Sequence, residues 1–163
     1  MCGIAGFCNW PGTREQQQNN LEKMKQRMLH RGPDAGGSYF TEDGQVGLGH
    51  RRLSIVDLSP TGLQPMKSHG GRYVIAYNGE IYNYQEIRKE LIEKHGCQFQ
   101  TNSDTEVILQ GYKTYGEKIA SMMTTDQQGF SMEARVLTVK DGKVSIPVGE
   151  NGAVLYKSIR NLI

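Results

Sequence analysis

Apolar side chains recur at helical spacing in two stretches of the chain. Their period of three to four residues predicts amphipathic helices over residues 14–29 and 84–95. The positions that mark them are Leu21, Met24 and Met28 in the first stretch, and Tyr84, Ile87 and Leu91 in the second. We expect these methionines to pack in the core rather than to hold a cofactor.

A third helix is expected over residues 105–115. Either Ser103 or Asp104 can cap its amino end, since both side chains accept hydrogen bonds from backbone N–H groups. Ser103 and Glu106 stand at the spacing of a capping box.

Short apolar runs bounded by turn residues predict strands. The expected strands are a buried one over residues 2–8, others near 38–41, 45–50, 53–56 and 72–77, and several within 129–158. Asp43-Gly44 is expected to turn a hairpin, and Asp141-Gly142 and Glu150-Asn151-Gly152 to separate the last strands. Loops are expected over residues 30–37 and 57–71. The pattern is that of an α+β protein with mostly antiparallel strands and helices stacked on sheets.

Composition narrows the class of protein. A length of 163 residues suits one domain, and a hydrophobic content of 37% allows an adequate core. No apolar run approaches the about 20 residues that span a bilayer, and no signal peptide is recognisable, so a cytoplasmic protein is expected. The net charge of +2, with both signs mixed, argues against nucleic acid as a partner. The cysteines are odd in number and lack metal-ligand spacing, which indicates reduced thiols and no metal site.

Cys2 follows the initiator methionine directly. If Met1 is removed, one residue carries both a thiol nucleophile and a free α-amino group. An α-amino group has a pKa of about 7.7–8.0, so it can serve as the base beside the thiol. The alternative is that Cys2 is a buried thiol at the start of a strand.

Three further segments have a chemical and a structural interpretation. Arg51 and Arg52 precede an apolar run and can grip a carboxylate, or they are solvated charges at a strand end. Asn78-Gly79 is typical of a tight hairpin turn, but the same amide and N–H groups can form an oxyanion hole. Asp104 is either a helix cap or an anchor for an ammonium group.

Taken together, these segments resemble the glutaminase domain of class II, N-terminal-nucleophile glutamine amidotransferases, and most of all that of glutamine-hydrolysing asparagine synthetases. The resemblance spans residues 1 to about 115. The matching segments are Met1–Gly6, His30-Arg31-Gly32-Pro33-Asp34, Leu48–Asp57 with Arg52-Leu53-Ser54-Ile55-Val56, Gln64-Pro65-Met66, Tyr77-Asn78-Gly79-Glu80-Ile81-Tyr82-Asn83 and Thr101–Ile108.

The resemblance implies a four-layer α-β-β-α sandwich that hydrolyses the side-chain amide of glutamine to glutamate and ammonia, without a cofactor. Cys2 would be the nucleophile and its own α-amino group the base, with Asn78 and Gly79 as the oxyanion hole. The implied substrate contacts are Arg52 for the α-carboxylate, Glu80 and Asp104 for the α-ammonium, and the backbone of Leu53, Ser54, Ile55 and Val56 along the glutamine, beside Asn78 and Gly79.

Two departures from the family limit what this sequence is expected to do. The ATP- and magnesium-dependent synthetase domain is missing, so a separate domain or subunit would have to receive the ammonia. Residues 124–163 keep only a faint echo of the family's later strands and are expected to be a divergent or unrelated tail of the 1–163 domain, which leaves the sandwich incomplete at its carboxyl end. The alternatives are a catalytically idle glutamine-binding or subunit-interaction module, and an unstable truncated fragment.

Overall fold

The structure is a computed structural model that describes residues 2–54, 62–124, 135–140 and 143–145. For the last two ranges only the backbone is considered. The elements in chain order are β1 (Gly3–Cys8), α1 (Arg14–Arg27), β2 (Ala35–Phe40), β3 (Val46–Arg52), β4 (Met66–Lys67), β5 (Tyr73–Ala76), α2 (Tyr84–His95), α3 (Asp104–Tyr115), the 3-10 turn η2 (Gly116–Lys118), α4 (Ile119–Met122), β6 (Arg135–Lys140) and β7 (Lys143–Ser145).

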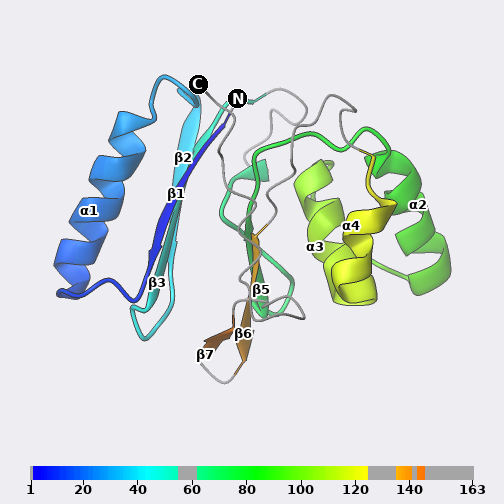
Figure 1. Ribbon diagram of the computed structural model, residues 1–163. Helices are drawn as coiled ribbons and strands as arrows, with labels where there is room; N and C mark the ends of the chain where they lie inside the picture. Colours follow the sequence, from blue (N-terminus) through cyan, green and yellow to red (C-terminus); the bar gives the residue numbers. More distant parts are fainter. Residues whose placement is uncertain (1, 55–61, 125–134, 141–142, 146–163) are drawn as a thin grey trace.

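These elements form four layers (Figure 1). Helix α1 covers the outer face of a sheet with strand order β1-β3-β2, and a second sheet of order β4-β5-β6-β7 lies behind it, covered in turn by α2, α3 and α4. Neighbouring strands are antiparallel throughout both sheets. The α-β-β-α sandwich expected from the sequence is therefore confirmed.

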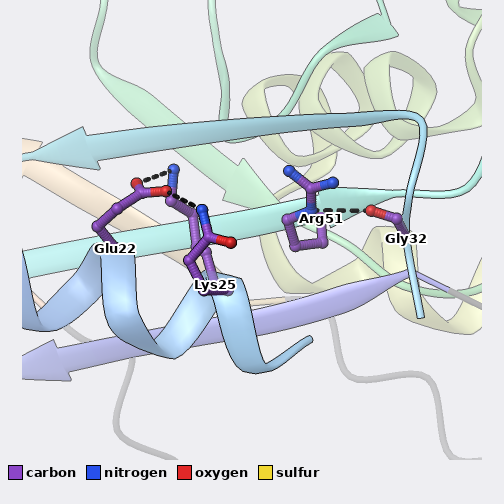
Figure 2. A network of polar contacts seen from close by, with 5 residues as sticks. Glu22, Lys25, Gly32 and Arg51 are labelled. Carbon is purple, nitrogen blue, oxygen red and sulfur yellow. Dashed lines mark hydrogen bonds and ion pairs between the residues drawn. The ribbon is translucent and has the colours of Figure 1, made fainter. Parts of the chain in front are cut away.

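Glycines let α1 lie close to the first sheet. A side chain at Gly49 of β3 would come within 2.9 Å of Lys25, and one at Gly3 of β1 within 3.0 Å of Met28. The register pairs Gly3 with Arg51. Because this register puts glycines under the helix, Lys25 is buried along its aliphatic stem while its ammonium group pairs with Glu22 at 2.7 Å (Figure 2).

The main hydrophobic core lies between the second sheet and the helices that cover it. Strand β5 provides its floor, and α2 and α3 close it from the outer side. Its buried members are Met66, Tyr73, Ile75, Tyr77, Ile81, Ile87, Leu91, Val107, Ile108, Leu109 and Ile119. The apolar face expected for residues 84–95 is confirmed, since Ile87 and Leu91 are buried and Tyr84 packs against the same core.

Several sequence predictions are corrected at the level of single elements. The first helix ends at Arg27 rather than at residue 29, and Met24 and Met28 are half-buried rather than fully in the core. The strand over residues 2–8 begins at Gly3 and alternates in burial, because only one of its faces meets α1. The strand near 38–41 begins at Ala35. The expected long loop contains the short strand β4.

The strand expected over residues 53–56 is wrong for its described part. Strand β3 ends at Arg52, and Leu53 and Ser54 form neither helix nor strand; Ile55 and Val56 lie outside the described residues. The Asp43-Gly44 hairpin is confirmed, since Gly44 has a φ of 71° and donates to Thr41. Of the late strands, β6 and β7 are described, and both turns expected there lie outside the described residues.

The amino end of α3 is capped differently from the predicted box. Ser103 is the cap, with its hydroxyl accepting from the N–H of Thr105 at 3.0 Å, and Asp104 is the first helical residue. Glu106 does not reach back to Ser103. It accepts instead from the N–H of Thr101 at 2.7 Å and from that of Gln100 at 2.9 Å. The carboxylate thus holds the turn before the helix rather than the cap itself.

Candidate active site

Cys2 lies directly before β1, with its sulfur against the end of β3. The N–H of Leu53 donates to Cys2 Sγ at 3.4 Å, and Sγ lies 3.7 Å from the Leu53 carbonyl oxygen. Cys2 is half-buried rather than enclosed. A thiol that is held by backbone groups and still reaches solvent is placed for reaction with a substrate, which a structural core cysteine is not.

The loop over residues 30–34 is bonded both to the backbone of Cys2 and to β3. Arg31 Nε donates to the Cys2 carbonyl at 3.2 Å, and Arg51 Nε donates to the Gly32 carbonyl at 2.8 Å (Figure 2). Gly32 presses against the backbone of β3, since a Cβ there would run into the carbonyl of Arg51. His30 is exposed, and this loop is held by Arg31 and Arg51.

Asp34 ties the same loop to the chain after β3. Its N–H donates to the Arg52 carbonyl at 3.1 Å, and its carboxylate accepts from the N–H of Ser54 at 2.7 Å. Arg52 itself is buried, with 8% of its surface exposed. Neither Arg51 nor Arg52 is a solvated rim charge. Arg51 is a structural clamp, and Arg52 is buried at the end of β3.

The segment after β5 begins with a backbone held from two sides. His50 Nε2 lies 3.2 Å from the carbonyl oxygen of Tyr77, and the N–H of Tyr77 donates to Gln64 Oε1 at 2.5 Å. Because the Tyr77 carbonyl can only accept, Nε2 of His50 is assigned the proton in this contact. Burial, together with Arg52 and Arg51 nearby and despite the bond to Tyr77, lowers the pKa of His50 to about 4. This contact joins the first sheet to the segment that follows the second sheet's central strand.

Asn78 and Gly79 do not turn a hairpin. Strand β5 ends at Ala76, and the next described element is α2, not a strand. The structure therefore excludes the tight-turn interpretation of Asn78-Gly79. Asn78 is half-buried and Gly79 exposed, and a Cβ on Gly79 would lie 2.5 Å from the Tyr77 hydroxyl. Both groups are thus available to a ligand at the end of β5.

Asp104 faces this segment from the start of α3. Its Oδ2 accepts from the N–H of Ile81 at 3.3 Å, and the Thr105 hydroxyl lies 3.4 Å from Oδ1. Burial raises the pKa of Asp104 above its ordinary value, and the exposed carboxylate of Glu80 raises it further against the hydrogen bonds that Asp104 accepts. The carboxylate of Glu80 is thus near enough for its charge to act on Asp104.

The predicted site residues therefore fall into two groups. One group lies at one end of the first sheet and consists of Cys2, Arg52, Leu53 and Ser54. The other group consists of Asn78, Gly79 and Glu80, which follow β5, and of Asp104, the first residue of α3. The His50–Tyr77 contact joins the elements that carry them. Ile55, Val56 and Met1 lie outside the described residues. Among the parts of the chain that the structure describes, no group of three or more His, Cys, Asp or Glu is placed to hold a metal ion.

Sequence reasoning missed three residues that organise the site. They are Arg31, His50 and Gln64, which contact Cys2 or Tyr77 through hydrogen bonds. All three stand inside the segments that carry the family resemblance, and this is the only sequence signal that points to them. Their partners are backbone groups distant in sequence, which residue spacing does not reveal.

A comparison with solved structures shows a related fold. The chain superposes on glutamine phosphoribosylpyrophosphate amidotransferase from Bacillus subtilis, a structure with ADP and GMP, with a TM-score of 0.55 and 22% identity over 83% of this chain and 34% of that chain. At this identity the likeness concerns the fold alone. The sequence profile of the glutamine amidotransferase domain matches residues 1–127, and the chain belongs to this family.

Relatives in sequence agree with this assignment. The chain is 46% identical over 125 residues to asparagine synthetase [glutamine-hydrolyzing] 1 of Bacillus subtilis, covering 76% of this chain and 19% of the relative. It is 40% identical to amidase chry2 of Gibberella zeae, covering 71% and 18%, and 38% identical to the asparagine synthetase of Zea mays, covering 76% and 20%. The chain thus spans about a fifth of the length of these relatives. The predicted boundary near residue 124 stays a prediction.

Proposed function

We propose that this domain hydrolyses the side-chain amide of glutamine, with Cys2 as the nucleophile. The observation that carries the proposal is the position of Cys2 Sγ, held at the first residue before β1 by the N–H of Leu53. Removal of Met1 would leave the α-amino group on the same residue, where it can take the thiol proton.

The reaction then follows from the atoms available. The sulfur attacks the amide carbon, and the thiol proton passes to the α-amino group. Asn78 Nδ2 and the N–H of Gly79 stabilise the oxyanion. The intermediate collapses as the α-ammonium returns a proton to the leaving nitrogen, which gives ammonia and a γ-glutamyl thioester. Water hydrolyses the thioester to glutamate and restores the thiol.

Substrate recognition needs groups for a zwitterion. Arg52 would bind the α-carboxylate through its guanidinium fork, and Glu80 and Asp104 would bind the α-ammonium. The raised pKa of Asp104 supports this assignment, since an incoming cation relieves the repulsion between the two carboxyl groups. The backbone of Leu53, Ser54, Ile55 and Val56 would lie along the glutamine side chain. The hydrolysis would need no cofactor.

The acceptor of the ammonia is proposed from the relatives. Most of those named above are glutamine-hydrolysing asparagine synthetases, so we propose that the ammonia serves asparagine synthesis in the cytoplasm, on a synthetase domain or subunit outside this sequence. ATP and Mg²⁺ would belong to that partner. None of the helices that the structure describes is long and apolar enough to cross a membrane.

The test is glutamate release from glutamine by the purified full chain. Cys2→Ala should abolish release, whereas Cys8→Ala, which removes the exposed thiol at the other end of β1, should leave it intact. Intact mass should show that activity follows the fraction of chains without Met1. Release that survives Cys2→Ala would exclude Cys2 as the nucleophile. Glutamine binding without release, by chains that lack Met1, would identify an idle binding module.

A further inference from the structure

One buried amide side chain connects the two segments that carry the oxyanion and ammonium groups. Gln64 is 8% exposed and lies just before β4. Its Oε1 accepts from the N–H of Tyr77, directly before Asn78-Gly79, and its Nε2 donates to Thr105 Oγ1 at 3.1 Å, directly after Asp104.

The chemistry of the partners fixes the direction of these bonds. The N–H of Tyr77 can only donate, so the amide oxygen of Gln64 must face Tyr77 and its NH₂ group must face Thr105. The Thr105 hydroxyl accepts that bond, which leaves its own proton free to donate toward Asp104 Oδ1, 3.4 Å away. The resulting chain of donors runs from Tyr77 through Gln64 and Thr105 to Asp104.

The backbone of Gln64 is fixed from the other sheet. A Cβ on Gly37 of β2 would run into the Gln64 carbonyl, so the backbones of these two segments are in contact. Gln64 is therefore anchored independently of the groups that its side chain holds. An anchored side chain with two directional bonds is suited to set the relative position of those groups.

We infer that Gln64 is a positioning residue that aligns the Tyr77–Gly79 segment with Asp104 and keeps the Thr105 proton directed at the Asp104 carboxylate. The inference rests on the proposed function, in which Asp104 binds the substrate's ammonium group. Gln64 itself touches no reacting atom in this scheme and acts through Tyr77 and Thr105.

Gln64→Glu tests the two hydrogen bonds of the Gln64 side chain separately, because it keeps the bond to Tyr77 and changes the bond to Thr105. A carboxylate still accepts from the N–H of Tyr77, but it also accepts the Thr105 proton and so takes it from Asp104. It places a further negative charge near Asp104. The titratable neighbours of Asp104 in the described residues are the Glu80 carboxylate, in the loop after β5, and the Tyr77 hydroxyl. Burial raises the pKa of Tyr77 above 10, so that hydroxyl stays neutral. The charged form of Asp104 is then disfavoured.

The first measurement needs no substrate. Carboxyl titration of the full chain by ¹³C NMR, with Asp104→Asn to assign the resonance, should show Asp104 protonating at a higher pH in Gln64→Glu than in the wild type. Gln110→Glu is the matched control, because Gln110 is also buried and its Nε2 donates to the Gln98 carbonyl at 3.1 Å, away from Asp104. Unchanged titration of Asp104 in Gln64→Glu would overturn the inference.

The second measurement is the kinetics of glutamine hydrolysis against pH. In Gln64→Glu the KM for glutamine should rise about tenfold with kcat changed less, and its increase toward low pH should begin at a higher pH than in the wild type. Gln64→Met, which loses both bonds, should lower kcat as well. A parallel fall of kcat in Gln64→Glu and Gln110→Glu, at constant KM, would indicate general destabilisation and contradict the inference.

The two failures remain distinguishable. If the proposed function is wrong, glutamate release persists in Cys2→Ala, a variant in which Gln64 is intact. If the inference about Gln64 is wrong, the titration of Asp104 is unchanged in Gln64→Glu, and this result is measured on folded protein without turnover.

Discussion

The N–H of Leu53 donates to the sulfur of Cys2 across 3.4 Å. The bond joins the first residue before β1 to the first residue after β3, which are neighbours in the sheet because Gly3 pairs with Arg51. Among the described residues, the Cys2 sulfur is therefore positioned by the backbone of Leu53. This arrangement suits a residue whose base is its own amino terminus.

Gly32→Ala should displace the loop that holds Cys2. A methyl group at this position meets the Arg51 carbonyl and lies 2.7 Å from the Arg52 nitrogen, so the loop or the strand end must move. We expect a loss of about 1–3 kcal/mol in the free energy of unfolding and a larger proportional loss of glutaminase activity. Gly70→Ala is the comparison variant. The methyl group has open space there, so this variant is strained only by its φ of 87° and does not displace the loop beside Cys2. Urea denaturation and glutamate release on both variants check this, and equal activity in the two would contradict it.

Stability should fall on acidification because His50 is buried in its neutral form. Its pKa of about 4 in the folded protein lies below the ordinary 6.5, so the unfolded chain binds a proton in this range and the folded chain does not. The free energy of unfolding should therefore decrease by roughly 3 kcal/mol as the pH falls from 6.5 to 4.

His50→Gln is the control for this pH dependence. A glutamine amide still offers an N–H toward the Tyr77 carbonyl but does not titrate. Urea midpoints between pH 4 and 7 should depend less on pH in this variant than in the wild type. An identical dependence in both would show that other groups cause it.

Glutamine affinity should weaken at low pH through Asp104. Burial and the nearby Glu80 raise its pKa, so Asp104 loses its charge at a higher pH than an ordinary aspartate does. KM should rise as the pH falls through this titration, while kcat changes less. Asp104→Asn keeps an acceptor for the Ile81 N–H but carries no charge, and it should raise KM about ten- to a hundredfold at neutral pH. A KM in this variant that matches the wild type would remove Asp104 from ammonium binding.

Glu106→Gln should destabilise the start of α3. The Glu106 carboxylate accepts from the Gln100 N–H and from both the N–H and the hydroxyl of Thr101, and an amide presents an NH₂ group to some of these donors. We expect a loss of about 1.5–3 kcal/mol by urea denaturation. Glu93→Gln removes an exposed carboxylate that lies 3.9 Å from Lys89 and should change stability by less than about 0.5 kcal/mol.

The sequence predicted elements whose pattern is local. The helix over residues 84–95 is confirmed at both bounds, since its apolar face is regular and Gly96 ends it in the left-handed conformation. A separate strand was wrongly predicted over residues 53–56, because Leu53-Ser54-Ile55-Val56 is an apolar run with strand propensity. In the structure the backbone of Leu53 and Ser54 bonds instead to Cys2 and Asp34. Tertiary contacts decided that boundary, and they are not visible in propensity.

The candidate site was predictable only through the family resemblance. Spacing alone left Asn78-Gly79 as a turn and Asp104 as a cap, and the structure contradicts both interpretations. Gln64 and His50 were not predicted, because each acts on the backbone of Tyr77 from a distant part of the chain.

The glycines that lie beneath α1 also determine how the chain tolerates insertions. Gly3 and Gly49 leave room for Met28 and Lys25 only in the observed register of β1 on β3. One residue added between Cys2 and Gly6 would either move a larger side chain under the helix or shift the sulfur away from Leu53. The length of the first few residues is therefore as constrained as their identity.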